Sequence, residues 1–122
     1  YPNKSDRLRK SGNDPGGDIF IHGGNVTIGC MPLGDSNIEQ LYIMAVDARS
    51  AAQKRIPVHI FPCRMDKAEN KRLLERYVKK RPELGPFWDE LRPIYDQFEE
   101  NRVVPAVSIN SSGEYKVKSR SE

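Results

Sequence analysis

DIFIHGGNVTIGCMPL, residues 18–33, is the stretch of sequence that decides the fold. Its apolar start lies between two pairs of glycines and predicts a short buried strand over residues 18–22 that ends at His22. Residues 26–28, Val-Thr-Ile, predict a second short strand. Gly29 permits a sharp turn of the backbone directly before Cys30. We therefore expect a histidine and a cysteine on adjacent backbone segments.

This pair of residue types allows a specific chemistry. An imidazole beside a thiol can take its proton and leave a thiolate nucleophile, and backbone N–H groups at a tight turn can converge on an oxyanion. A structural interpretation fits the same residues, because a buried free cysteine behaves as a small hydrophobic residue and a histidine at a strand end is often held by hydrogen bonds. The residue types and their spacing leave both interpretations open.

The order His22-Gly23, then Thr27-x-Gly29-Cys30, resembles a known signature. It is the His-Gly…Ser/Thr-x-Gly-Cys motif of the L,D-transpeptidase (YkuD-like) family, bacterial cysteine enzymes that remodel peptidoglycan. The resemblance implies that Cys30 is the nucleophile and His22 the base, oriented by the carbonyl of Gly23. Thr27 takes the Ser/Thr position of the motif, and the Gly29 and Cys30 amides would be the oxyanion donors.

Three longer segments are similar to the YafK-like branch of this family. They are GDIFIHG at 17–23, IGCMPL at 28–33 and PVHIFPCRM at 57–65. The resemblance implies an α/β (mixed) fold, with a β-sheet flanked by helices. It also implies a cysteine acyltransferase or peptidase that forms a thioester with a peptidoglycan stem peptide and needs no cofactor.

The acceptor would decide the outcome of such a reaction. An amine gives transpeptidation and water gives hydrolysis, and the YafK-like branch is associated with cutting a link between peptidoglycan and a lipoprotein. Peptidoglycan stem peptides and that lipoprotein are therefore the expected partners. Because peptidoglycan lies outside the cytoplasmic membrane, we expect a periplasmic location, although this sequence shows no export signal.

The sequence departs from the family pattern in two ways. Many members carry an arginine two positions after the nucleophile, where this chain has Pro32, so Arg64 is our candidate for gripping a substrate carboxylate. A salt bridge within the fold is the alternative role for Arg64. The family domain also opens with strands that are not in this sequence. We therefore expect residues 1–65 to be the C-terminal half of the catalytic domain, and 66–122 a helical extension packed as part of it.

Composition narrows the remaining possibilities. The 122 residues carry a formal net charge of +3, too small to indicate nucleic-acid binding, and no apolar run is long enough to span a membrane. The two cysteines allow one disulfide or two free thiols, and the resemblance favours free thiols. A non-catalytic fragment or peptidoglycan-binding module is one alternative. A zinc module using His22, Cys30, His59 and Cys63 is another, although we expect no metal.

The rest of the chain alternates between helical and strand patterns. Residues 1–17 lack an apolar period and predict a loop, while 57–61 are rich in β-forming residues and predict a strand. Ser36-x-x-Glu39 and Asp66-x-x-Glu69 match the capping box that begins a helix. The patterns predict three helices, at 36–53, 67–80 and 86–99, and a C-terminal hairpin at 106–117. Pro93 should kink or break the last of these helices.

Overall fold

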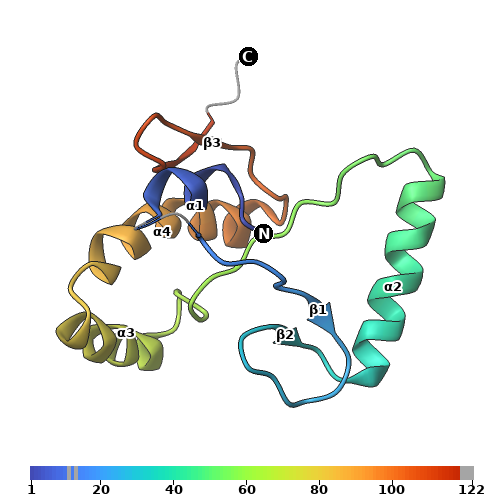
Figure 1. Ribbon diagram of the computed structural model, residues 1–122, viewed down its shortest axis with the longest axis horizontal. Coiled ribbons are helices and arrows are strands. Elements are labelled where there is room, and N and C mark those ends of the chain that lie inside the picture. The colour runs from blue at the N-terminus through green and yellow to red at the C-terminus, as the bar shows by residue number, and fades with distance from the viewer. Residues whose placement is uncertain (11, 13, 119–122) are drawn as a thin grey trace. The chain divides into compact units, whose positions relative to one another are not determined.

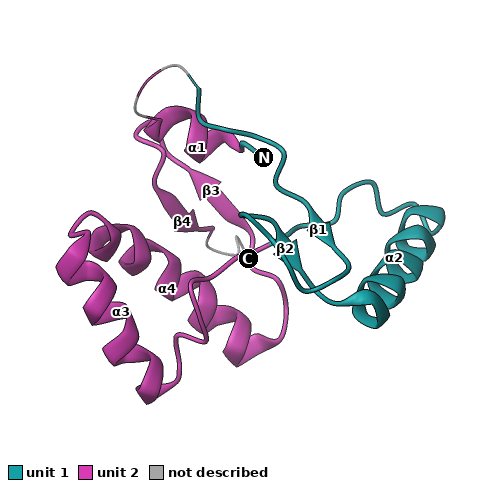
Figure 2. Ribbon diagram, turned by 60° about the horizontal axis from the view of Figure 1, so that its bottom comes forward, with its two compact units in different colours: residues 1–2, 14–58 teal, residues 3–13, 59–122 magenta. Residues whose placement is uncertain are grey.

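A computed structural model describes residues 1–10, 12 and 14–118. The chain divides into two compact units (Figure 2). Unit 1 comprises Tyr1–Pro2 and Asp14–Val58, and unit 2 comprises Asn3–Asn13 and His59–Glu122. The boundary predicted between residues 65 and 66 stays a prediction.

Unit 1 is built from a pair of parallel strands and one helix (Figure 1). Strand β1, Ile21–His22, pairs with β2, Met31–Pro32, so that Ile21 lies opposite Met31 and His22 opposite Pro32. Two further backbone bonds extend this pairing, from Met31 N–H to the Phe20 carbonyl at 2.8 Å and from Leu33 N–H to the His22 carbonyl at 2.9 Å. These backbone hydrogen bonds therefore confirm the prediction that the two motif segments lie next to each other.

The predicted strands of this region are partly wrong. The strand expected at 18–22 is limited to β1, because Asp18 has a left-handed φ of 53° that interrupts extended backbone. Residues 26–28 form no strand, and Val26 and Ile28 are fully exposed. Residues 57–61 form no strand either. A strand needs a neighbour for its N–H and C=O groups, and no described strand pairs with 57–61.

Helix α2, Asp35–Ser50, confirms the helix predicted at 36–53. The Ser36 capping box does not form: the helix begins after Gly34, whose φ of 76° suits a glycine. No residue of α2 is buried, and Tyr42 is 70% exposed. The helix is therefore specified by local propensity and by the loop at its N-terminus.

Unit 2 holds three described helices and a hairpin. Helices α3, Ala68–Lys80, and α4, Leu84–Asn101, confirm the two predicted helices, and α4 continues through Pro93 without a break. The Asp66 capping box does not form, since α3 begins after Lys67 without a side-chain cap. Strands β3, Val107–Ile109, and β4, Tyr115–Val117, pair antiparallel and confirm the hairpin.

The core of unit 2 lies beside α4. Its buried members are Met65, Leu91 and Tyr95, with Ile94 and Leu74 also buried on the two helices. Partly buried residues pack around this cluster: Phe61, Cys63, Phe87, Trp88 and Tyr115. The hydrophobic effect therefore stabilises this unit through one small aromatic and aliphatic cluster.

A short helix replaces part of the loop predicted at 1–17. Helix α1, Lys4–Arg9, begins with a capping box in which Asn3 and Asp6 exchange side-chain and backbone hydrogen bonds. Its Ser5 is almost completely buried, and the Ser5 hydroxyl donates to the Gly113 carbonyl in the hairpin turn at 2.5 Å. The spacing Asn3-x-x-Asp6 is the sequence signal for this helix.

The mixed helix and strand content agrees with the α/β class at this coarse level. The described strands form two separate two-stranded sheets, not the one larger sheet with flanking helices that was predicted. Among the described helices, none combines the length and the apolar character needed to cross a bilayer.

Candidate active site

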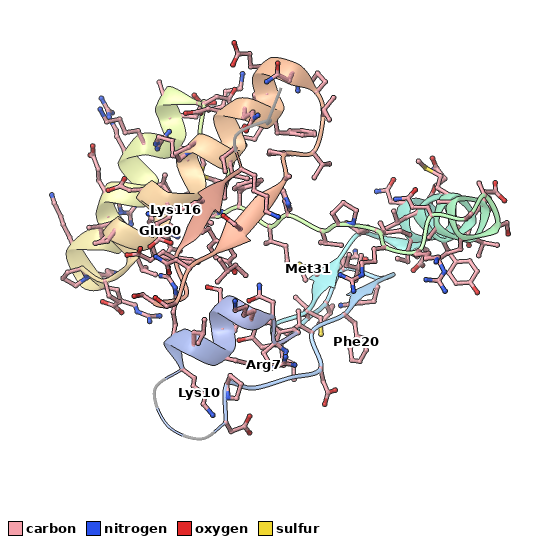
Figure 3. All side chains as sticks on the ribbon, turned by 90° about the horizontal axis from the view of Figure 1, so that it is seen from above. Arg7, Lys10, Phe20, Met31, Glu90 and Lys116 are labelled. Carbon is pink, nitrogen blue, oxygen red and sulfur yellow. The ribbon has the colours of Figure 1, made fainter. Side chains whose placement is uncertain are left out.

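The site begins where β1 and β2 meet. Because Ile21 is paired with Met31, the preceding residues Phe20 and Cys30 stand side by side, and His22 follows Phe20 by two positions. Side chains two apart on an extended segment share a face. Figure 3 shows Phe20 and Met31 on the two neighbouring segments. The backbone therefore brings the predicted nucleophile and the predicted base to the same short strand pair.

The imidazole of His22 is held by its own neighbour. Its Nδ1 lies 2.5 Å from the carbonyl oxygen of Gly23, the contact that the family resemblance implied. A carbonyl can only accept a hydrogen bond, so Nδ1 carries the proton and Nε2 of the neutral ring is left as an acceptor. His22 is half-buried, so the orientation is fixed without closing the ring off from solvent.

The Cys30 thiol has other partners in this structure. Its Sγ donates to the Asp18 carbonyl and accepts from the Phe20 N–H, both at 3.4 Å. Within the described residues the thiol makes no hydrogen bond to His22. The side chain is half-buried and lies along the backbone that leads into β1. Direct contact between Cys30 and His22 stays a prediction.

Thr27 organises the turn before the cysteine. Its hydroxyl donates to the Cys30 carbonyl and accepts from the Gly29 N–H, both at 3.0 Å. Gly29 has a φ of 149°, which side chains rarely tolerate. The Gly29 amide is thereby occupied within the turn, whereas the Cys30 N–H has no acceptor among the described residues. Of the two predicted oxyanion donors, the Cys30 amide is the one left available here.

One residue of the site was not predicted. Asp35, the first residue of α2, accepts a hydrogen bond from the Gly24 N–H at 2.7 Å. A Cβ placed on Gly23 would lie 2.7 Å from Asp35 Oδ1 and 3.1 Å from Ile38 Cγ2. A side chain at position 23 would therefore force the Asp35 carboxylate or Ile38 to move. The acidic residue directly after Gly34 was the available sequence signal.

Arg64 lies in unit 2 and takes part in ion pairs there. Its guanidinium is 3.2 Å from Asp66 and 3.8 Å from Glu99, and the side chain is 60% exposed. The Tyr95 hydroxyl also donates to Asp66, and this bond lowers the pKa of the Asp66 carboxyl. The salt-bridge role left open by the sequence is therefore observed. Substrate binding by Arg64 stays a prediction.

The second histidine and cysteine belong to unit 2. Burial lowers the pKa of His59 and raises the pKa of Cys63, and both cysteines are free thiols. His59 packs edge-on against Phe61, with ring centroids 6.2 Å apart. In the part of the chain that the structure describes, no group of three His, Cys, Asp or Glu side chains is placed to hold a metal ion.

Comparison with known proteins identifies two relatives. Both are named "Putative L,D-transpeptidase YafK", from Escherichia coli strain K12 and from Escherichia coli O157:H7. Each is 33% identical over 109 residues, which is 89% of this chain and 41% of the relative. The chain thus spans about two fifths of the length of these relatives. A scan against protein-family models gives no match.

Proposed function

The chain is a relative of the YafK-like L,D-transpeptidases, and on that premise we propose that it carries the cysteine and histidine of a peptidoglycan-modifying enzyme. Cys30 acts as the nucleophile and His22 as the general base. The stem peptides of peptidoglycan are the acyl donors, and a lipoprotein joined to peptidoglycan is a second substrate. This activity places the working protein in the periplasm, where peptidoglycan lies.

The reaction proceeds in two steps. The His22 Nε2 takes the proton of the Cys30 thiol, and the thiolate attacks the carbonyl carbon of an L,D peptide bond. The resulting oxyanion is stabilised by the Cys30 N–H, and the amine leaves with the proton from the imidazolium. An amine or water then attacks the thioester, which forms a new amide or a free acid and returns the thiol.

The Nδ1 contact with Gly23 is the observation that carries this proposal. It selects the tautomer whose Nε2 accepts a proton, which a base beside a thiol requires. The proposal requires the Cys30 side chain to rotate away from the Asp18 carbonyl so that Sγ faces Nε2. The hydrogen bonds that this rotation breaks are the two sulfur contacts with Asp18 and Phe20, each 3.4 Å long.

Mass spectrometry of the chain incubated with a tetrapeptide-stem muropeptide tests the proposal. We expect an acyl adduct on Cys30, or its turnover product, and neither in Cys30→Ser. His22→Ala should slow adduct formation by about 10²- to 10⁴-fold, the usual contribution of general-base catalysis. Cys63→Ser is the matched control, because it removes the other half-buried thiol and should leave the adduct intact.

A peptidoglycan-binding module without catalysis is the second candidate. The engagement of the Cys30 thiol with the Asp18 carbonyl, instead of with His22, favours it. This candidate predicts that the chain binds the muropeptide but that the mass of Cys30 never changes. Binding with no adduct at any pH between 6 and 9 would therefore replace the catalytic proposal.

A further inference from the structure

A small apolar groove lies on the surface of unit 2, between α3 and α4. Figure 2 shows these helices side by side in the unit. The groove has a volume of about 240 Å³ and is lined by Pro62, Leu73, Leu74, Tyr77 and Trp88. The rings of Tyr77 and Trp88 meet edge to face, with centroids 6.5 Å apart. Tyr77 is 52% and Leu73 39% exposed, so these two side chains of the groove are open to a ligand.

Helix α3, which forms one side of this groove, is rich in positive charge. Five cations of α3 make no ion pair among the described residues: Lys71, Arg72, Arg76, Lys79 and Lys80. Residues three apart on a helix are surface neighbours. Arg76 follows the groove residue Leu73 by three positions, and Lys80 follows Tyr77 by three. An anion held at the edge of the groove would therefore meet two cations beside an aromatic wall.

This combination selects one kind of ligand. The exposed face of an aromatic ring suits a sugar ring with an apolar face, and the cations suit carboxylates. The groove is smaller than the sites of about 300–1,000 Å³ that enclose whole small molecules, so it fits one ring of a longer chain. A membrane surface fits less well, because the apolar residues of α3 already line the groove or pack toward α4, as the burial of Leu74 shows.

We propose that the groove binds the glycan of peptidoglycan, with a sugar ring against Tyr77 and Trp88 and the carboxylates of the polymer beside Arg76 and Lys80. The choice of polymer rests on the proposed function. The groove would hold the polymer on unit 2 separately from the chemistry at Cys30. It therefore affects the capture of the insoluble polymer and not the reaction of a short peptide.

Cosedimentation with purified peptidoglycan sacculi tests this proposal, using the full chain carrying Cys30→Ala so that no turnover interferes. Reversing two charges beside the groove, Arg76→Glu with Lys80→Glu, should weaken binding at least tenfold. Tyr77→Ala should weaken it by a similar factor without changing charge. The matched control is Lys116→Glu with Lys118→Glu, which changes net charge equally at exposed positions of β4 and just after it and should bind normally. Lys116 is labelled in Figure 3.

The outcomes separate the groove from the proposed function. Loss of binding in the groove variants alone supports the proposal. An equal loss in the control pair would show that binding depends only on net charge and would overturn the proposal. Binding to vesicles with anionic lipids but not to sacculi would also overturn it. Acylation of Cys30 by a short stem peptide is measured separately in chains with Cys30 intact. The groove variants should react normally there, and failure of all chains would refute the proposed function alone.

Discussion

Substitution of Gly23 by alanine should disturb the loop that carries His22, through a contact that can be worked out from the structure. The added Cβ would stand 2.7 Å from Asp35 Oδ1 and 3.1 Å from Ile38 Cγ2. Gly23 does not have a left-handed φ, so the backbone itself accepts alanine. The effect must therefore come from crowding against α2.

The size of the effect follows from what can move. The Asp35 carboxylate is exposed and can rotate, but rotation breaks its 2.7 Å bond with the Gly24 N–H. Hydrogen bonds to charged groups are worth about 1.5–3 kcal/mol, and solvent exposure puts this one at the lower end. Contact with Ile38 adds a few tenths of a kcal/mol. We therefore expect Gly23→Ala to destabilise the loop by about 1–2 kcal/mol, a factor of roughly 5–30 in the equilibrium.

Amide hydrogen exchange of Gly24, followed by NMR, measures this directly. Gly23→Ala should speed exchange by that factor, whereas Gly17→Ala, where nothing lies within 4 Å of the new Cβ, should leave it unchanged. In a chain that already carries Asp35→Ala, the carboxylate is gone and Gly23→Ala should have little further effect. Fully additive effects of the two substitutions would refute the reasoning, because they would show that Gly23 and Asp35 are not coupled.

Three other predictions follow from the site and from unit 2. Thr27→Val should lower the acylation rate of Cys30 by about tenfold, because it removes two hydrogen bonds of the turn, whereas Thr27→Ser, which keeps them, should react normally in the mass assay. Iodoacetamide at pH 7.5 should label Cys30 before Cys63, because burial raises the pKa of Cys63 and lowers its thiolate fraction; peptide mapping that finds Cys63 labelled first would contradict this. The Tyr95 hydroxyl lowers the pKa of Asp66, so the stabilising effect of this hydrogen bond is present at neutral pH and is lost as the pH falls through the folded-state pKa of Asp66. Tyr95→Phe should therefore make the free energy of unfolding in urea less dependent on pH between 6 and 2, and an unchanged pH profile would refute the coupling.

The helices could be predicted from the sequence because their signals are local. Apolar spacing placed all three long helices within a few residues, and the hairpin was predicted from two β-rich runs around Asn110 and Gly113. The strands at 26–28 and 57–61 could not be settled in this way. Strand formation depends on a partner at a distance along the sequence, and β propensity alone does not supply one.

The site shows the same division between local and distant contacts. The contact of His22 with the Gly23 carbonyl joins adjacent residues and was expected from the motif. The hydrogen bond of Cys30 with Asp18 spans 12 positions, and Asp18 has a left-handed backbone; no sequence pattern indicated either feature. The capping box predicted at Ser36 does not form because α2 begins earlier, directly after the glycine that precedes Asp35. The capping box predicted at Asp66 does not form because the Asp66 carboxylate accepts a hydrogen bond from the Tyr95 hydroxyl instead.

The position of α1 has a consequence for how the chain acquires its structure. Ser5 and Arg9 both donate to the carbonyl of Gly113, so the first helix is completed only by residues more than a hundred positions later. Closing a flexible loop of that length costs about 4 kcal/mol in entropy. During synthesis, Ser5 and Arg9 of α1 therefore lack their hydrogen-bond acceptor until the hairpin has emerged from the ribosome. Among the described helices, α1 is synthesised first but should be among the last to acquire protection from hydrogen exchange, which places the slow, high-contact-order step of folding at the docking of α1.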